Sequence, residues 1–325
     1  MPEKNVKVAL VQHPPVFLNL QKTLAKVETI AAKSAKSGAK IIVFPETWAS
    51  GYPIWLDEAP KAALWDFAPA KRLYQYLTEN SLQIPGEDFT KLQKIAKQNA
   101  VYLVLGVHEK SGGTLYNTTV YFAPDGDYKI HRKLTPTYTE KLIWGVGDGS
   151  TLNVLETPFG ILGGLICWEH WLPLARAAMH ARNETIHTAQ FPTVHERHQI
   201  ASRHYAFEGQ CFVLASGCVL SKTEAIEGFL SLETGDEEVL ALLESMEKDL
   251  LQRGGSAIIA PDAGYVVEPV FDKAEIIHGE LELDLVKQGK LLLDTDGHYS
   301  RPDVFELRVN DKPNKNVTFS SENPD

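Results

Sequence analysis

The feature that most constrains the fold is a regular alternation of extended and helical patterns in the first hundred residues. Residues 6–12, 41–44 and 101–107 are apolar runs typical of buried strands. Between them, residues 19–37 and 87–99 repeat apolar side chains at helical spacing. The order is strand, helix, strand, helix, strand, which predicts an α/β fold.

The rest of the chain adds hairpins and then resumes the alternation. Turn residues at Pro124-Asp125-Gly126-Asp127 and Pro261-Asp262-Ala263-Gly264 predict two hairpins. We expect further strands over 116–122, 128–132, 161–166, 186–190, 211–216, 256–260, 265–270 and about 276–284. We expect helices over about 171–182 and 197–208, and a short helix that follows the last strand and ends near 293.

The domain organisation follows from length and composition. The chain has 325 residues, of which 44% are hydrophobic and 23% charged, enough for one large core. We expect residues 1–310 to form a single domain and residues 311–325 a polar C-terminal tail. Residues 224–249 hold nine acidic residues and one basic residue.

Apolar side chains still recur at helical spacing in this acidic segment; they are Val239, Leu240, Leu243, Met246 and Leu250. We therefore expect an inserted amphipathic helix within about 224–252. Either its apolar face packs on its own chain or it forms a subunit contact.

Charge and hydropathy argue against two classes of partner. The formal net charge is -10, and clustered Lys and Arg residues are lacking, so nucleic acid is not an expected partner. The longest apolar run, residues 159–168, is too short to cross a bilayer, and the first residues lack a signal-peptide pattern. We expect a cytoplasmic protein without a membrane partner.

Three reactive side chains stand where predicted strands end, the place where open α/β sheets gather ligands. Glu46 follows the strand that Pro45 stops, Lys133 closes the strand at 128–132, and Cys167 follows the strand at 161–166. A carboxylate, a cation and a thiol are the parts of an acyl-transfer site. Taken singly, each would be an ordinary surface or core residue.

Cys167 is distinguished from the other two cysteines by its surroundings. Gly163 and Gly164 precede it and permit close approach of another group. A predicted helix with Pro173 in its first turn follows, and the dipole of that helix would favour a thiolate. Cys211 and Cys218 lie in or beside an apolar strand, and we expect them to be structural.

Histidines offer two alternatives. His170 stands three residues after Cys167 and could form a Cys–His dyad, provided the segment is already helical there. A second group, His195, Glu196, His198 and His204, matches no metal-ligand template, so we expect a surface helix and no metal.

The sequence around the three reactive residues resembles the nitrilase branch of the carbon–nitrogen hydrolase superfamily, whose triad is Glu, Lys and Cys in that chain order. The matching motifs are Phe44-Pro45-Glu46, residues 131–137 (HRKLTPT) and residues 164–169 (GLICWE). Glu140 is similar to a second family glutamate thought to orient catalytic groups. Residues 144–150 (WGVGDGS) and 167–170 (CWEH) look like nitrilases rather than amidases. The resemblance covers nearly the whole chain, apart from a tail shorter than the one implicated in filament assembly in many relatives.

The resemblance implies a four-layer α-β-β-α sandwich and a homodimer or larger homo-oligomer. It also implies hydrolysis of a nitrile to a carboxylic acid and ammonia, with water as co-substrate and no cofactor. Cys167 would attack to give a thioimidate and then a thioester, Glu46 would be the base, and Lys133, with the Trp168 N–H, would stabilise charge. Residues expected to wall the substrate pocket are Tyr52, Trp144, Trp168 and Pro192.

Several rival functions remain open at this stage. An amidase, a carbamoylase or a cyanide-degrading enzyme would use the same triad on another substrate. A thiol enzyme assisted by His170 would differ in mechanism. A non-catalytic scaffold on the same fold would use none of these residues.

Overall fold

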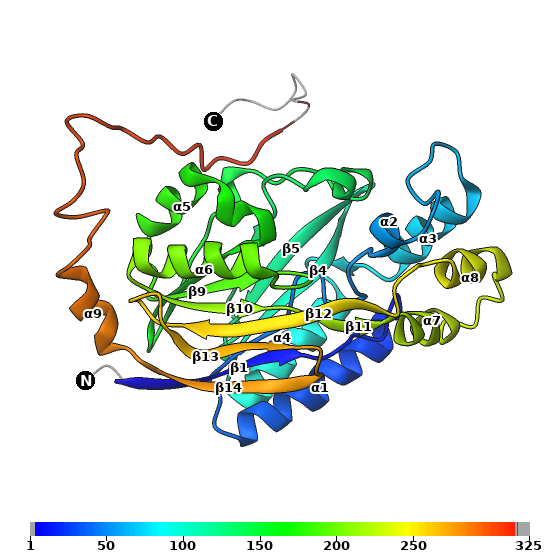
Figure 1. The fold of residues 1–325 in the computed structure, drawn as a ribbon, viewed down its shortest axis with the longest axis horizontal. Coiled ribbons are helices and arrows are strands. Elements are labelled where there is room, and N and C mark those ends of the chain that lie inside the picture. Colours follow the sequence, from blue (N-terminus) through cyan, green and yellow to red (C-terminus); the bar gives the residue numbers. More distant parts are fainter. Residues whose placement is uncertain (1–3, 316, 318–325) are drawn as a thin grey trace.

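The computed structural model describes residues 4–315 and 317, and within them two seven-stranded sheets (Figure 1). The strands of the first sheet are β1 (Asn5–Gln12), β2 (Ile41–Val43), β3 (Leu82–Gln83), β4 (Tyr102–Ser111), β5 (Thr114–Phe122), β6 (Tyr128–Arg132) and β14 (Glu275–Glu282). Their order is β14-β1-β2-β4-β5-β6, with β3 beside β4. β1, β2 and β4 are parallel, whereas β14, β5 and β6 pair antiparallel.

The second sheet repeats this plan with a parallel centre and antiparallel edges. Its strands are β7 (Leu155–Thr157), β8 (Gly160–Ile166), β9 (Ile186–Gln190), β10 (Phe212–Ser216), β11 (Val219–Ser221), β12 (Leu250–Ile259) and β13 (Tyr265–Phe271). Their order is β11-β12-β10-β9-β8-β7, with β13 beside β12. β8, β9 and β10 are parallel.

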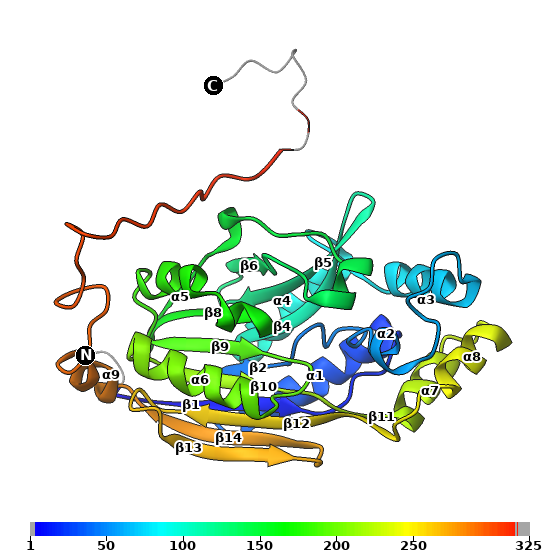
Figure 2. The same ribbon diagram turned by 45° about the horizontal axis from the view of Figure 1, so that its top comes forward.

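Helices cover the outer faces of the two sheets, and the apolar clusters show the layers. α1 (Leu20–Lys36) and α4 (Glu87–Asn99) bury their apolar faces against the first sheet. α5 (Pro173–His180) and α6 (Glu196–Gly209) do the same against the second (Figure 2). A third cluster, with Val8 and Val43 from one sheet and Leu162 and Phe212 from the other, lies between the sheets. The predicted four-layer α-β-β-α sandwich is confirmed.

The acidic segment differs from the single helix expected there. It forms two helices, α7 (Lys222–Leu230) and α8 (Glu237–Glu244), and Leu250 already belongs to β12. Asp236 caps α8 and accepts a hydrogen bond of 2.6 Å from Arg72 Nε on α3 (Ala68–Glu79). Val239 and Leu243 are fully buried. The apolar face of the insertion therefore packs on its own chain.

Other elements were missed or shifted. The sequence patterns predicted neither α3 nor α2 (Trp55–Glu58), and the strands β3, β7 and β11 are too short to show a period. The helix expected over 171–182 is a 3-10 turn, Cys167–Trp171, followed by α5, because Pro173 opens a new helix. α9 (Asp284–Lys290) ends earlier than expected.

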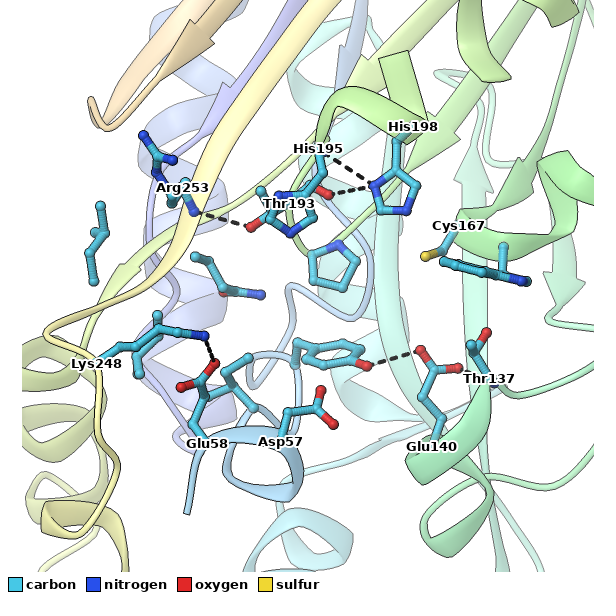
Figure 3. Close-up of a pocket in the computed structure, with 17 residues that line it drawn as sticks. Asp57, Glu58, Thr137, Glu140, Cys167, Thr193, His195, His198, Lys248 and Arg253 are labelled. Atoms are coloured by element: carbon cyan, nitrogen blue, oxygen red, sulfur yellow. Dashed lines mark hydrogen bonds and ion pairs between the residues drawn. The ribbon is translucent and has the colours of Figure 1, made fainter. Parts of the chain in front are cut away.

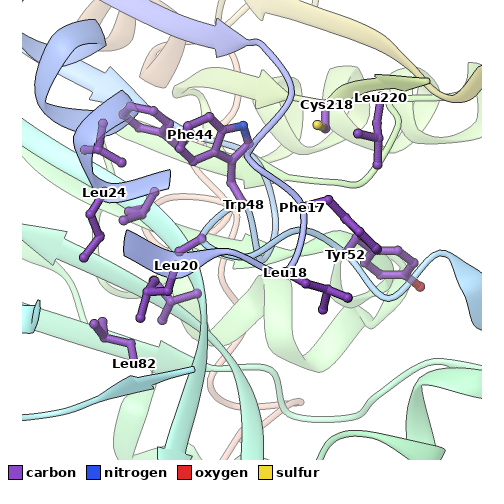
Figure 4. Packing of buried hydrophobic residues seen from close by; sticks show 14 of the residues in the cluster. Phe17, Leu18, Leu20, Leu24, Phe44, Trp48, Tyr52, Leu82, Cys218 and Leu220 are labelled. Atoms are coloured by element: carbon purple, nitrogen blue, oxygen red, sulfur yellow. The ribbon is translucent and has the colours of Figure 1, made fainter. Parts of the chain in front are cut away.

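A dense aromatic cluster supports the loop after β2 (Figure 4). The rings of Phe44 and Trp48 lie 4.7 Å apart, and Trp48 Nε1 donates to the His13 carbonyl at 2.6 Å. Cys218 is buried among these residues, and Cys211 is buried beneath α5 and α6, in apolar surroundings as expected.

Residues of the C-terminal segment between 299 and 309 line a pocket together with Ala177, Ala178 and His180 of α5. Further on, the Asn314 N–H donates to Asp148 Oδ2 at 2.8 Å. The expected tail over 311–325 lies largely outside the described residues. Within the described part of the chain, no helix has the length and apolar character needed to cross a membrane.

Candidate active site

The ends of three strands bring Glu46, Lys133 and Cys167 together at one end of the sandwich. Glu46 follows β2 and Lys133 follows β6 in the first sheet, whereas Cys167 follows β8 in the second. All three side chains are buried. Lys133 Nζ donates to Glu46 Oε1 at 2.8 Å and to Glu140 Oε2 at 2.7 Å. The site is therefore assembled from both sheets.

Glu46 is held from below by β4 and from the side by β5. A Cβ on Gly106 would lie 2.3 Å from the Pro45 carbonyl oxygen, so only glycine lets β4 pass under the Glu46 loop. Asn117 Nδ2 donates to Glu46 Oε1 at 2.7 Å. Glu46 Oε2 is buried without a hydrogen-bond partner among the described residues. Burial raises the pKa of Glu46 to about 7, although Lys133 opposes the shift.

Lys133 is a cation held between two carboxylates. Burial works against its charge, but Glu46 and Glu140 outweigh that effect and raise its pKa. Glu140 is itself fixed, since Oε2 accepts from the Thr137 N–H at 2.6 Å and Oε1 accepts from the Tyr52 hydroxyl at 3.0 Å. Lys133 therefore stays charged and has little freedom to move.

Cys167 occupies a left-handed backbone conformation, with φ 48°, at the sharp turn between β8 and the 3-10 turn. Such a conformation is rare for a residue with a side chain and is typical of functional sites. Burial, followed by the Glu46 charge, raises the pKa of the Cys167 thiol well above its usual value, although Lys133 opposes this. The expected dipole-stabilised thiolate is therefore wrong for the resting site, because burial and the carboxylate dominate.

His170 does not contact the Cys167 thiol. Its Nδ1 lies 2.8 Å from the Cys167 backbone oxygen, and its Nε2 lies 3.0 Å from His187 Nε2. Burial, and then His187, lowers its pKa to about 3. This geometry is incompatible with the Cys–His dyad considered from the sequence.

Glu169 joins the loop that carries Lys133 to the turn that carries Cys167. Its Oε1 accepts from the Leu134 N–H at 2.7 Å, and its Oε2 accepts from the Ile166 N–H at 2.6 Å. Oε2 also lies 2.8 Å from His131 Nε2. Burial opposes charge on both side chains, yet their attraction lowers the pKa of Glu169 and raises that of His131.

A pocket of about 330 Å³ opens beside Cys167 (Figure 3). Cys167 and Glu140 face the same space (Figure 3), and Tyr52, which also lines the pocket, donates its hydroxyl to Glu140. Trp168 and Pro192 line the pocket as well. Trp144, which was also expected to wall the pocket, does not line it, because it packs behind Tyr52 with the two ring centroids 5.8 Å apart. Lys133 Nζ lies over the Trp144 ring at 5.9 Å.

The histidine group near residue 195 is only partly on the surface. His195 and His204 are exposed, but His198 is buried, lines the pocket and lies 6.0 Å from the Trp168 ring. The expectation of a purely exposed helix face is wrong for His198, because α6 turns it toward the pocket. No His, Cys, Asp and Glu grouping suited to a metal occurs in residues 4–315.

Sequence reasoning missed the residues that hold the reactive groups. Asn117 stands mid-strand in β5, and its contact with Glu46 spans 71 positions of sequence. The sequence of β5 places Asn117, a polar residue, at a buried position of the strand. A buried polar side chain needs a hydrogen-bond partner, and this is the local indication that Asn117 contacts another polar group. Glu169 lies within the motif at residues 164–169. Its hydrogen bonds to the Leu134 and Ile166 N–H groups could not be predicted, because they depend on how the loop after β6 meets the turn after β8.

The amino-acid sequence matches a family model and is similar to several named enzymes. A family model described as carbon-nitrogen hydrolase matches residues 7–290. Nitrilase 1 of Arabidopsis thaliana is 35% identical over 320 residues, which cover 98% of this chain and 90% of the relative. The bifunctional nitrilase/nitrile hydratase of Lupinus angustifolius is 36% identical over 317 residues, covering 97% and 89%.

A solved structure shares the fold. The carbon-nitrogen hydrolase from Helicobacter pylori G27 superposes with a TM-score of 0.66 at 18% sequence identity. The match covers 89% of this chain and 93% of that chain. At this identity the likeness concerns the fold alone.

Proposed function

This chain belongs to the carbon–nitrogen hydrolase family, and on that premise we propose that it is a nitrilase that converts an organic nitrile and water to a carboxylic acid and ammonia. The observation that carries the proposal is the buried Glu46–Lys133–Glu140 cluster beside the Cys167 thiol at the pocket. Relatives named as nitrilases, about 35% identical over nearly the whole chain, support the nitrile as substrate.

The first chemical step joins Cys167 to the nitrile carbon. Glu46 accepts the thiol proton as sulfur attacks, and that proton passes to the nitrile nitrogen, which gives a covalent thioimidate. A thiol with a raised pKa needs such a base, since little thiolate exists at rest. Glu46, with a pKa of about 7, is suited to both taking and returning the proton near neutral pH.

Lys133 meets the charge that develops on nitrogen during attack. Its ammonium is fixed by Glu46 and Glu140, so no reorganisation is needed when charge appears. The backbone N–H of Trp168 is the second proposed donor. Glu140 acts through Lys133 and is a positioning residue.

Water completes the reaction in two steps. Glu46 activates a first water, which adds to the thioimidate carbon; the tetrahedral intermediate then expels ammonia and leaves a thioester. A second water releases the carboxylic acid and restores the thiol. Collapse of the tetrahedral intermediate with loss of sulfur instead of ammonia would release the amide. The chain needs no metal or organic cofactor for these steps.

The pocket indicates a small organic substrate. A volume of about 330 Å³ lies at the lower end of the usual range for ligand sites. Tyr52, Trp168 and Pro192 provide apolar surface near Cys167, whereas Asp57, Glu58 and Lys248 supply charge at its outer part. We propose that these residues contact the body of the nitrile.

At the level of the whole protein we propose a cytoplasmic homodimer or larger homo-oligomer that has neither nucleic acid nor membrane as a partner. Exposed apolar side chains on α5 and α6, including Leu174 and Phe207, support a contact between subunits. The net charge of -10 supports the absence of nucleic acid.

The decisive assay compares nitriles with amides. The purified protein is incubated with aliphatic, aromatic and arylacetic nitriles and with the matching amides, and ammonia, amide and acid are measured. We expect acid and ammonia in equal amounts from at least one nitrile. Turnover of amides alone would point to an amidase and contradict the proposal.

A non-catalytic scaffold makes a different prediction. Cys167→Ala should abolish turnover while the variant stays folded, whereas Cys211→Ala should retain activity. Turnover by Cys167→Ala, or none by the parent protein on any nitrile or amide, would remove the proposed mechanism.

A further inference from the structure

A buried chain of hydrogen bonds runs from the backbone of Cys167 to a carboxyl group behind the site. His170 Nδ1 lies 2.8 Å from the Cys167 carbonyl oxygen, and His170 Nε2 lies 3.0 Å from His187 Nε2. His187 Nδ1 in turn lies 3.0 Å from both carboxyl oxygens of Glu184. The three side chains are at most 3% exposed, so water does not share in these bonds.

The Glu184 carboxyl group is enclosed by β8 and by Tyr205 of α6. A Cβ on Gly163 would lie 2.1 Å from Glu184 Oε1, so β8 makes room for this carboxyl group. The Tyr205 hydroxyl donates to Oε2, and the Tyr205 ring stacks on His187 at 3.7 Å. Within residues 4–315, no Lys or Arg forms an ion pair with Glu184.

The number of protons determines which groups donate in this chain of hydrogen bonds. It consists of three hydrogen bonds, and each needs one hydrogen between two heavy atoms. Two neutral histidines carry one ring proton each, so the third proton must come from Glu184. If Glu184 were ionised with both rings neutral, one link would face lone pair against lone pair, which is costly in a dry interior.

At its Cys167 end, this chain of hydrogen bonds contacts the peptide group whose N–H, at Trp168, is proposed for catalysis. The Cys167 carbonyl and the Trp168 N–H belong to one planar trans peptide, so they point in opposite directions. A donor on the carbonyl side therefore fixes the direction of the N–H, and it also polarises the peptide. His170 is that donor when its proton is on Nδ1.

We propose that Glu184 is held as a neutral carboxylic acid and that, through His187 and His170, it orients the Cys167–Trp168 peptide so that the Trp168 N–H faces the reacting nitrogen. Glu184, His187 and His170 are positioning residues, since none of them touches substrate. The proposal rests on the nitrilase function only for the role of the N–H, not for the protonation of Glu184.

The surroundings favour this proton arrangement. Burial raises the pKa of Glu184 to about 8, although the Tyr205 hydroxyl and the charges of His180 and His131 oppose the shift. Burial also lowers the pKa of His187 and of His170. The alternative with an ionised Glu184 and an imidazolium has the same proton count, but it places two charges in the interior.

The other titratable groups around the chain are engaged elsewhere. They are His180 on α5, whose Nε2 lies 3.1 Å from Glu208, His131, held by Glu169, and His198 on α6, whose Nδ1 lies 2.9 Å from the Thr193 carbonyl. Glu208 also accepts from Arg176 at 2.7 Å. Loss of the Glu184 proton is therefore the event that breaks the chain as pH rises through about 8.

A pair of variants tests the positioning role. Glu184→Leu removes the donor and should lower kcat about tenfold at pH 7, with KM changed less than about threefold, because one transition-state donor is misdirected. Glu184→Gln still donates an N–H to His187 and accepts from Tyr205, so it should restore most of kcat. It should also lack the fall in kcat that the parent shows above about pH 8.

Glu208→Gln is the matched control, because it replaces a nearby carboxyl group that Arg176 and His180 hold ionised. It should keep the alkaline fall of the parent. A Glu184→Gln variant as impaired as Glu184→Leu, or one that keeps the alkaline fall, would overturn the proposal.

Nitrogen-15 NMR of the parent protein tests the chain without any nitrile and without a variant that must fold. We expect two neutral rings at pH 7, with the proton on Nδ1 in His170 and on Nε2 in His187. An imidazolium, or the opposite tautomers, would refute the neutral Glu184. If the tautomers are as expected but nitriles are not turned over, the proposed function fails and the protonation of Glu184 stands.

Discussion

At the scale of single residues, the site pairs a thiol that resists ionisation with a carboxylate that titrates near neutrality. Burial raises the pKa of both Cys167 and Glu46, and the Glu46 charge raises the pKa of Cys167 further. Lys133 opposes both shifts and stays charged. The resting site thus places a neutral thiol beside a carboxylate, which is the arrangement that the proposed proton transfer to Glu46 requires.

The pKa of Glu46 predicts an acid limb in the activity. The base must be ionised, so kcat/KM should rise about tenfold per pH unit below the pKa and level off above about pH 7. Glu46→Gln should lose about 10² to 10⁴ in kcat at pH 7.5. The measurement is kcat/KM for one nitrile as a function of pH, limited to the pH range in which circular dichroism shows that the protein is folded. A flat profile between pH 5.5 and 7 would count against Glu46 as the base.

The sequence pointed to the residues that we propose to be reactive, but not to their ionisation. Motifs and strand ends singled out Glu46, Lys133 and Cys167, whereas the dipole argument for a thiolate failed. The failure has a physical cause: desolvation and the Glu46 charge depend on three loops that meet only in the fold.

At the scale of secondary-structure elements, the site depends on how closely β4 approaches the Glu46 loop. Gly106 has no room for a Cβ against the Pro45 carbonyl. Gly106→Ala should push Glu46 away from Lys133 and lower kcat/KM at least about tenfold, because small displacements of catalytic groups are costly. Gly113→Ala, in the β4–β5 turn, meets no atom within 4 Å and is the matched control. Equal activity of the two variants would show that the approach does not matter.

Glu169 links two elements, the loop after β6 and the turn after β8. Glu169→Gln should lower the free energy of unfolding by about 3 kcal/mol, since His131 loses its buried partner and two backbone N–H groups lose a charged acceptor. Glu306→Gln breaks an exposed pair with Arg308 and should cost less than about 1 kcal/mol. Urea denaturation of both variants measures the difference. A Glu169→Gln effect no larger than the control would contradict the structural role.

Periodicity predicted most central elements to within a few residues, including β6 and β9 with their observed bounds. Periodicity failed where tertiary packing, and not the local pattern, determines where a helix forms. α3 shows only Leu73 and Leu77 buried, and the acidic segment splits into α7 and α8 because Asp236 caps a second helix. Partners such as Asn117 stayed invisible, since their contacts join positions far apart in sequence.

At the scale of the whole molecule, the two sheets pack face to face and each is covered by one helical layer. Periodicity alone predicted an α/β fold; the four layers came from the resemblance to carbon–nitrogen hydrolases. Sheet order is non-local: β14 pairs with β1 across the whole domain, with Glu282 opposite Asn5. No local pattern encodes such a pairing.

The outer face of α5 and α6 is the surface where the proposed oligomer can be tested. Leu174 is 69% exposed. Leu174→Asp should reduce the native mass toward that of a monomer, because a charge buried in a subunit contact is unfavourable. Val266→Asp, on β13, should leave the mass unchanged. Analytical ultracentrifugation of the two variants and the parent measures this, and an unchanged mass for Leu174→Asp would argue against a contact through α5.

The most direct test of the central claim, that Cys167 attacks a nitrile carbon, is mass spectrometry of the protein quenched with acid during turnover of a slow nitrile. We predict an intact-mass increase equal to the nitrile or to its acyl group, located on the peptide that contains Cys167 and absent from Cys167→Ala. A nitrile-derived adduct on Cys211 or Cys218 instead, or full turnover by Cys167→Ala, would contradict the claim.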